Sequence, residues 1–114
     1  MIFDSHAHYD DEAFNEDREA ILNSLPENGI SPIVNVSAQL SGVTATVELT
    51  EKYPFIYGSV GVHPDHVGEL SEEKIQWMKE LAGREKIVAV GEIGLDHYWD
   101  TESDEVQRKW FIRQ

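Results

Sequence analysis

Short β-branched and aromatic runs alternate with amphipathic segments along the whole chain. The first run begins at Ile2 and leads to His6, and the later runs cover residues 33–36, 55–62 and 87–90. The run over 55–62 is almost continuously apolar, which is typical of a strand that is buried on both faces. The pattern therefore predicts four strands, each followed by a segment with a different periodicity.

The segments between and after these strands have their apolar residues on one side, as helices do. We expect helices over 15–25, 41–52, 71–81 and 103–114. Asn15 is the expected N-cap of the first helix and Ser71 that of the third, because short polar side chains accept hydrogen bonds from free backbone N–H groups. The inner face of the last helix is expected to consist of Val106, Trp110 and Phe111.

Four β–α units in sequence order indicate an α/β protein with a parallel sheet and right-handed crossovers. Four units can be half of a TIM-type (β/α)8 barrel, which typically needs about 250 residues. An open three-layer sheet is the alternative. We predict that residues 1–114 form a single incomplete (β/α)4 half-barrel domain.

Composition and charge narrow the class of protein. The chain has no cysteine, which excludes disulfides and thiolate metal sites, and it has neither a signal-peptide pattern nor an apolar stretch of membrane-spanning length. We therefore expect a cytoplasmic protein that does not enter membranes. The formal net charge of −13 argues against a general nucleic-acid binder. It does not exclude an enzyme acting on phosphodiesters, because bound divalent cations can invert the field of an acidic pocket.

Two histidines stand at the end of the first predicted strand, as His6-Ala7-His8. Alternation in an extended chain points both imidazoles to the same side, where two nitrogens can bind one divalent cation at about 2.1 Å each. Asp4 and Asp10 flank the pair and are candidates for orienting the rings. The alternative is a pair of surface histidines without a metal.

Polar residues also follow the third and fourth strands. His63 either contacts a substrate phosphate or a metal-bound water, or it is a hydrogen-bonded structural histidine. Asp65 after it is expected to be solvated. Glu92 stands where an apolar run would otherwise continue, and burying a carboxylate alone is costly, so it is either a metal ligand or paired with a basic residue. Asp96 either holds a ligand's second nitrogen or caps the next loop. Trp99 on that loop either packs or stacks on bases.

No motif for a serine or cysteine nucleophile and no phosphate-binding glycine loop is present. The candidate ligands are imidazole nitrogens and carboxylate oxygens, which suit Zn²⁺, Mn²⁺ or Mg²⁺. Metal-assisted hydrolysis is therefore the chemistry that the residues favour.

Three segments of the chain resemble the amino-terminal motifs of the TatD family of metal-dependent deoxyribonucleases, in the family's order and near its spacing. They are FDSHAH at 3–8, VGVHP at 60–64 and AVGEIGLD at 89–96. The last helix, with Gln107, Phe111 and Gln114, also resembles the family's segment after its fourth strand. The resemblance covers essentially all 114 residues.

The resemblance implies an amidohydrolase-type (β/α)8 barrel that hydrolyses phosphodiester bonds in DNA. On this reading, His6 and His8 bind one divalent metal ion, and Glu92 binds the same ion or bridges to a second. His63 and Asp96 would be the supporting catalytic residues. Family members are about twice as long and carry further ligands after later strands, so the implied site is incomplete and the chain is expected to be inactive or weakly active alone.

Two other functions remain open at this point. The chain could be another amidohydrolase-type enzyme that acts on a lactone or an amide, although Glu92 in place of a strand-end lysine argues against it. Alternatively, it could be a non-catalytic half-barrel. Because four parallel strands leave two open edges, we also expect self-association through these edges.

Overall fold

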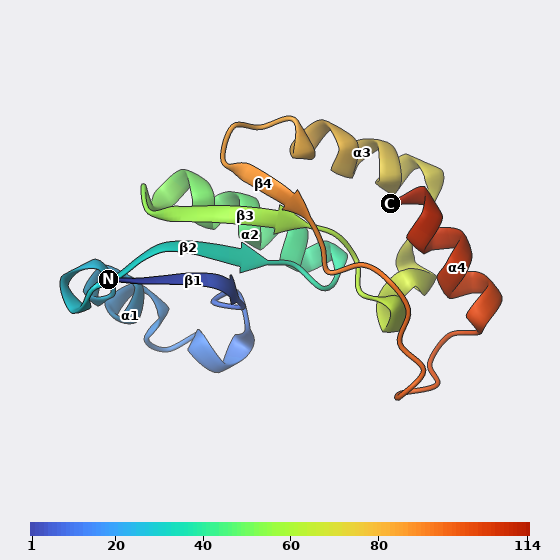
Figure 1. Ribbon diagram of the computed structural model, residues 1–114, viewed down its shortest axis with the longest axis horizontal. Helices are drawn as coiled ribbons and strands as arrows, with labels where there is room; N and C mark the ends of the chain where they lie inside the picture. The colour runs from blue at the N-terminus through green and yellow to red at the C-terminus, as the bar shows by residue number, and fades with distance from the viewer.

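The four strands form one parallel sheet in the order β1-β2-β3-β4, which is also their order in the sequence (Figure 1). The structure is a computed structural model that describes residues 1–114. The strands are β1 at Ile2–Ala7, β2 at Ile30–Val36, β3 at Ile56–Val60 and β4 at Ile87–Val90. All four strand ends point to the same edge of the sheet, and helices connect the strands. The predicted parallel (β/α)4 arrangement is therefore confirmed.

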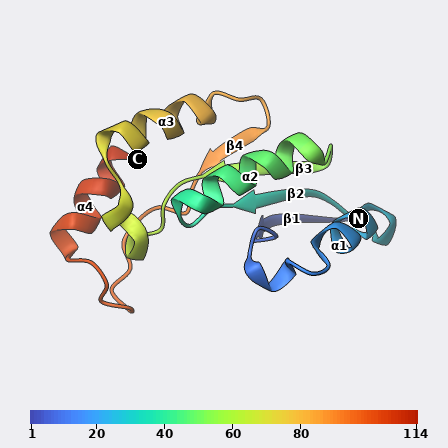
Figure 2. The same cartoon turned by 180° about the vertical axis from the view of Figure 1, so that it is seen from behind.

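The helices cover one face of this sheet. They are α1 at Arg18–Ser24, α2 at Leu40–Lys52, α3 at Glu72–Ala82 and α4 at Asp104–Arg113, with short 3-10 turns η1 at Glu12–Phe14, η2 at Pro26–Asn28 and η3 at Pro64–Glu69. Figure 2 shows α2 in front of the strands, whereas the strands lie in front in Figure 1. α4 lies beyond the carboxyl edge, beside η3. The sheet thus has one covered and one open face.

The predicted helix starts at 41, 71 and 103 lie within one residue of the observed starts, and the predicted start at 15 is wrong. The hydroxyl groups of Ser71 and Ser103 accept hydrogen bonds from backbone N–H groups of α3 and α4, as N-caps do. The first helix begins at Arg18 instead of Asn15. The Asn15 side chain accepts a hydrogen bond from Arg18 Nη2 at 3.0 Å, so it is not free to cap a helix.

The core lies between the sheet and the helices, in two clusters of apolar side chains. One cluster is centred on α2, α3 and β3, and the other on α1, α2 and β2. Each fully buried aliphatic side chain contributes about 1.5–3 kcal/mol to folding. On α4, the predicted inner residues Trp110 and Val106 pack in or against the core, so the prediction is confirmed for these two. It is wrong for Phe111, which is 43% exposed. Gln107 is fully buried instead. Its side-chain amide is hydrogen-bonded to backbone groups of Asp96 and Glu102.

The two outer strands expose apolar side chains. Ile2 and Phe3 of β1 are 61% and 59% exposed, and Val88 and Val90 of β4 are 54% and 48% exposed. An uncovered strand edge with apolar side chains can pair with further chain. None of the helices is long and apolar enough to cross a membrane.

Candidate metal centre

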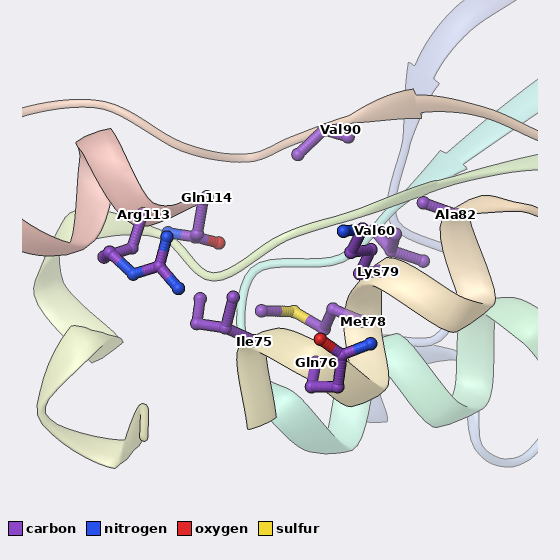
Figure 3. A pocket seen from close by; sticks show the side chains of 9 residues that line it. All are labelled: Val60, Ile75, Gln76, Met78, Lys79, Ala82, Val90, Arg113 and Gln114. Carbon is purple, nitrogen blue, oxygen red and sulfur yellow. The ribbon is translucent and has the colours of Figure 1, made fainter. Parts of the chain in front are cut away.

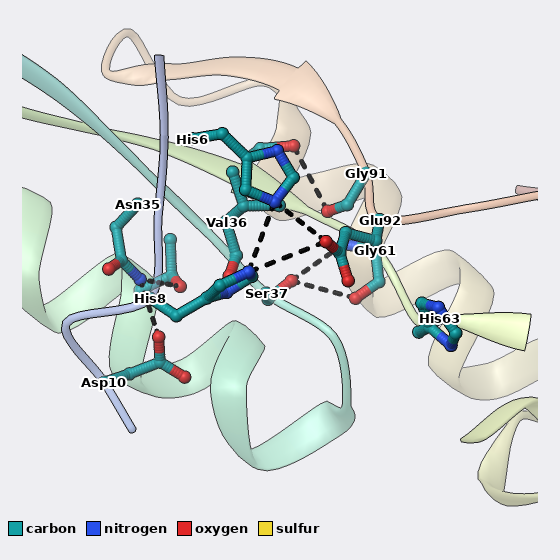
Figure 4. A network of polar contacts seen from close by, with 12 residues as sticks. His6, His8, Asp10, Asn35, Val36, Ser37, Gly61, His63, Gly91 and Glu92 are labelled. Carbon is teal, nitrogen blue, oxygen red and sulfur yellow. Dashed lines mark hydrogen bonds and ion pairs between the residues drawn. The ribbon is translucent and has the colours of Figure 1, made fainter. Parts of the chain in front are cut away.

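Three side chains from the first and last strands meet at the carboxyl edge of the sheet. His6 and His8 come from the end of β1, and Glu92 follows β4 by two residues. His6 Nε2 lies 2.8 Å from Glu92 Oε1 and 3.2 Å from His8 Nε2, and His8 Nε2 lies 3.6 Å from Glu92 Oε1. Figure 4 shows the two rings and the carboxylate pointing toward one another. We call these three residues the metal cluster.

The spacing in the metal cluster fits one divalent cation. A cation about 2.1 Å from each ligand atom would hold these atoms roughly 3–3.5 Å apart, and all three atoms lie within 4.8 Å of one another. Two imidazole nitrogens and a carboxylate oxygen form a donor set that suits Zn²⁺ or Mn²⁺. The structure thus brings together the three residues that the sequence nominated, and cation binding itself stays a prediction.

The His8 ring has a fixed orientation. Its Nδ1 lies 2.8 Å from the backbone oxygen of Val36 on β2, and a carbonyl oxygen can only accept a hydrogen bond. His8 therefore carries its proton on Nδ1, which leaves the lone pair of Nε2 directed at the metal cluster. The flanking aspartates do not orient the rings: the Asp4 carboxylate accepts from the His6 backbone N–H at 3.2 Å, and Asp10 contacts Asn35.

Glu92 is placed by a close approach of two glycines. A Cβ atom at Gly61 would lie only 2.7–2.9 Å from backbone atoms of Gly91, so only glycine lets the ends of β3 and β4 come so near. The Glu92 backbone N–H donates to the Ser37 carbonyl at 2.8 Å. The Glu92 side chain is 26% exposed, and its ion-pair partners are the two imidazoles rather than a lysine or arginine.

A second polar cluster follows β3 and β4, which we call the His63 cluster: His63, Asp65 and Asp96. His63 Nδ1 contacts the Asp65 carboxylate, and His63 Nε2 lies 3.5 Å from Asp96 Oδ2. Asp96 Oδ1 also accepts from the Tyr98 backbone N–H at 2.9 Å, so this carboxylate caps the next loop as well. The expectation that Asp65 is merely solvated is wrong, because it orients the imidazole. His63 stands apart from the metal cluster (Figure 4).

Gln107 of α4 and Gln114, which directly follows α4, hold backbone groups next to the His63 cluster. The Gln107 amide accepts from Asp96 N–H and donates to Asp96 O, both at 2.8 Å. The Gln114 amide accepts from Val62 N–H at 2.7 Å and donates to Val62 O at 3.1 Å. Each side-chain amide thus satisfies both the N–H and the C=O of one loop residue, as the backbone of a neighbouring strand does in a sheet.

The loop that follows His8 is clamped by one guanidinium group. Arg18 donates to the carbonyl oxygens of Tyr9 and Asp11 at 2.5 and 2.8 Å. Burial raises the pKa of the Tyr9 phenol, and the nearby Asp4 carboxylate raises it further. Tyr9 therefore stays neutral and serves packing.

Two open hollows flank the metal cluster and share Glu92. One, of about 700 Å³, runs past His8 toward the start of α2, and the other, of about 420 Å³, is lined by His6, His63 and Asp96 among others. The two hollows thus border both predicted groups of site residues. One group is His6, His8 and Glu92, and the other is the pair His63 and Asp96.

Another cavity, with both apolar and polar lining residues, lies elsewhere. It measures about 390 Å³ and lies between α3, the ends of β3 and β4, and the end of α4 (Figure 3). Its lining includes Ile75, Met78 and Val90 but no imidazole or carboxylate. None of its lining residues belongs to the metal cluster or to the His63 cluster.

The sequence gives no functional prediction for two buried residues at the site, Asn35 and Ser37. Both have no exposed surface. The one signal for them is that polar residues stand at the end of an apolar strand, where burial requires hydrogen-bond partners.

Comparison with known proteins gives a consistent family and fold. The family model of the TatD related DNases matches residues 3–114. An uncharacterized metal-dependent hydrolase of Bacillus subtilis, YabD, is 37% identical over 114 residues, which are 100% of this chain and 45% of the relative. A protein of Dickeya dadantii named 3'-5' ssDNA/RNA exonuclease TatD is 26% identical, with 99% of this chain and 43% of the relative covered.

A solved structure agrees with the fold. The crystal structure of YjjV from Escherichia coli, a TatD homologue, superposes with a TM-score of 0.80 at 27% identity, over 98% of this chain and 44% of that chain. The four β–α units therefore match half of a TIM-type barrel, as predicted. The chain spans less than half the length of the curated relatives that it matches.

Proposed function

Because the chain belongs to the TatD related DNase family, we propose that it carries the amino-terminal half of a metal-dependent hydrolase that cleaves phosphodiester bonds in DNA. The observation that supports this most directly is the convergence of His6, His8 and Glu92 at the carboxyl edge of a parallel sheet. Enzymes of this architecture have their active sites at that edge. The relatives named as exonucleases support a nucleic acid as the substrate.

The metal cluster supplies three ligands. A bound Mg²⁺, Mn²⁺ or Zn²⁺ would stabilise the negative charge that develops on a phosphoryl oxygen. His8 presents its Nε2 lone pair because Val36 holds its Nδ1 proton, and Glu92 adds a negative ligand that is only 26% exposed. Since the net charge of the chain is −13, the protein without a cation would repel a phosphodiester.

We assign supporting roles to His63 and Asp96. The Asp65 backbone N–H donates to His63 Nδ1 at 3.2 Å, which leaves the proton of the neutral ring on Nε2, and Nε2 faces the hollow that also contains His6 and Glu92. At this place Nε2–H can donate to a non-bridging phosphate oxygen, while Asp96 at 3.5 Å keeps the ring turned to the hollow. His63 therefore binds the substrate and Asp96 orients His63, and neither of them binds the metal.

Calorimetric titration with Zn²⁺ and Mn²⁺ tests the metal site. We expect binding heat for the chain and none for the His6→Ala/His8→Ala double variant. Both side chains are about half exposed, at 53% and 42%, so the double variant should still fold. Absence of heat, or heat that survives the double change, rejects the site.

Activity is tested with labelled single- and double-stranded DNA in Mg²⁺ or Mn²⁺, beside a panel of lactones. Because the chain spans less than half of its relatives, we expect slow DNA cleavage that the His6→Ala/His8→Ala change abolishes. Cleavage of lactones alone would favour the other amidohydrolase-type function. None of the five lysines directly follows a strand, which argues against that second function.

We also propose that the 114-residue chain self-associates. Its outer strands β1 and β4 both expose apolar side chains, and head-to-tail pairing of two copies would cover them. Light scattering should give a dimer or a larger assembly, and a stable monomer would contradict this. The cytoplasmic location stays a prediction from the lack of cysteine.

A further inference from the structure

The end of β2 and the two residues after it contact both polar clusters although they contribute no ligand. We call residues 35–38 the β2 exit segment. Each of these residues forms a hydrogen bond with a different part of the site. Asn35 holds the loop after His8, Val36 holds the His8 ring, Ser37 holds Gly61 and Glu92, and Ala38 O accepts from the His63 backbone N–H at 2.8 Å. Four consecutive residues thus connect both polar clusters.

Asn35 ties the chain that follows His8 to α2. Its Oδ1 accepts from Tyr9 N–H at 2.7 Å, and its Nδ2 donates to Asp10 Oδ1 at 3.0 Å and to Thr46 Oγ1 at 2.8 Å. Figure 4 shows Asn35 beside Asp10, next to the strand that carries both imidazoles. Because Asn35 is fully buried, water cannot replace these three bonds.

Ser37 ties β2 to the ends of β3 and β4. Its hydroxyl donates to Gly61 O at 2.8 Å and accepts from Gly61 N–H at 2.9 Å. Its carbonyl accepts from Glu92 N–H at 2.8 Å. The Ser37 side chain therefore fixes Gly61, against which Gly91 packs, and its backbone fixes Glu92 directly.

We infer that Asn35 and Ser37 are positioning residues of the metal cluster: they set the distance between the two imidazoles and the Glu92 carboxylate. This inference rests on the proposed metal site. Its physical basis is that the residues of the metal cluster come from the two outer strands, which are not paired with each other. The distance between these residues is therefore set by β2 and β3, which lie between the outer strands. A preorganised ligand set binds a cation more tightly than a loose one.

The test compares Zn²⁺ affinity and the absorption spectrum of bound Co²⁺ between the chain and its variants. Ser37→Ala and Asn35→Ala should each weaken Zn²⁺ binding by about 10- to 100-fold, the range for residues that orient metal ligands. The Co²⁺ spectrum should shift as well, because the ligands are then held at other angles. Thermal unfolding without metal checks that each variant still folds cooperatively.

A swap of donor and acceptor tests the Asn35 contact without leaving a cavity. Asn35→Asp places a second carboxylate against Asp10, so we expect binding as weak as in Asn35→Ala. Adding Asp10→Asn restores the hydrogen bond with its direction reversed, while the Thr46 hydroxyl can turn to donate to the new carboxylate. The double variant should regain most of the lost Zn²⁺ affinity.

Thr50→Ala is the matched control, because the buried Thr50 hydroxyl donates to Val47 O within α2, away from the site. Its Zn²⁺ affinity should equal that of the unchanged chain. If Ser37→Ala and Asn35→Ala also bind like the unchanged chain, or if the swap restores nothing, the positioning role is wrong although the site stands. If the His6→Ala/His8→Ala variant keeps its affinity, the metal site itself is wrong.

Discussion

The carboxyl edge of the sheet carries two polar clusters that are held in different ways. The metal cluster is fixed by backbone and buried side-chain groups of the neighbouring strand β2, through Val36 and Ser37. The His63 cluster is fixed mainly by α4, through the amides of Gln107 and Gln114. The Gln114 contact joins residues 52 positions apart in the sequence.

Because of this difference, we expect that a substitution can disturb the metal cluster or the His63 cluster without disturbing the other. Hydrogen bonds from β2 and the residue after it place the metal cluster, and contacts from α4 and the residue after it place the loops around His63. Ala38 is the one residue of the β2 exit segment that bonds the His63 cluster, through the His63 backbone. A substitution near Gly61 should therefore disturb metal binding, whereas one in α4 should leave it intact.

Gly61→Ala should have the largest effect. The new methyl group would lie 2.7–2.9 Å from the Gly91 backbone, which cannot move aside as a flexible side chain does. We expect a loss of about 2–3 kcal/mol in the free energy of unfolding, measured by urea denaturation. Zn²⁺ affinity should fall as well, because the ends of β3 and β4 separate and carry Glu92 away from His6.

Gly83→Ala serves as the control for this change. Gly83 lies just after α3 at a φ of −78°, and its nearest neighbour is the Glu80 carbonyl oxygen at 3.3 Å. We expect a change within about 1 kcal/mol and unaltered Zn²⁺ binding. Equal loss of affinity in both variants would mean that general stability, and not the approach of Gly61 to Gly91, governs the metal cluster.

Gln107→Met should break the other cluster with a smaller effect. Methionine keeps the volume but removes the partner of Asp96 N–H and the donor to Asp96 O and Glu102 O. Leaving these buried groups unpaired should cost about 1–2 kcal/mol. Calorimetry should show unchanged Zn²⁺ affinity while DNA cleavage falls. A parallel loss of metal binding would contradict the separation of the two clusters.

The repeating apolar runs were enough to predict the parallel (β/α)4 sheet, because strand and helix periods differ and Ser71 and Ser103 mark two helix starts. The start of α1 could not be predicted in this way. Asn15 has the right chemistry for an N-cap, but Arg18, three residues later, engages its side chain and the carbonyl oxygens of the preceding loop. Such a tertiary contact leaves no local signal.

The same limit applies to the candidate site. His6, His8 and Glu92 are reactive side chains at strand ends, so their chemistry is visible in the sequence and their convergence follows from a parallel sheet. Asn35 and Ser37 have ordinary polar side chains whose role depends on partners 24 to 26 positions away. A single sequence shows which groups can bind a metal better than which groups hold them in place.

Arg113→Ala should have the smallest effect and a characteristic pH dependence. Arg113 donates from Nη2 and Nε to the Glu72 carboxylate at 2.5 and 2.9 Å, which joins the end of α4 to the start of α3 on the surface. The hydrogen bond from Arg113 lowers the pKa of Glu72. A carboxylate with a lowered pKa stabilises the folded state above its unfolded pKa, and this contribution is lost as the pH falls through the folded value.

The thermal midpoint of Arg113→Ala should therefore lie slightly below that of the unchanged chain near neutral pH, and the gap should close in acid as Glu72 becomes protonated. High salt should also narrow the gap, because both side chains are about half exposed. Arg108→Ala is the control, since Arg108 pairs with Asp104 inside α4 and does not join the two helices. A gap that stays constant as the pH falls would mean that Arg113 acts through its packing against the cavity beside α3, and not through Glu72.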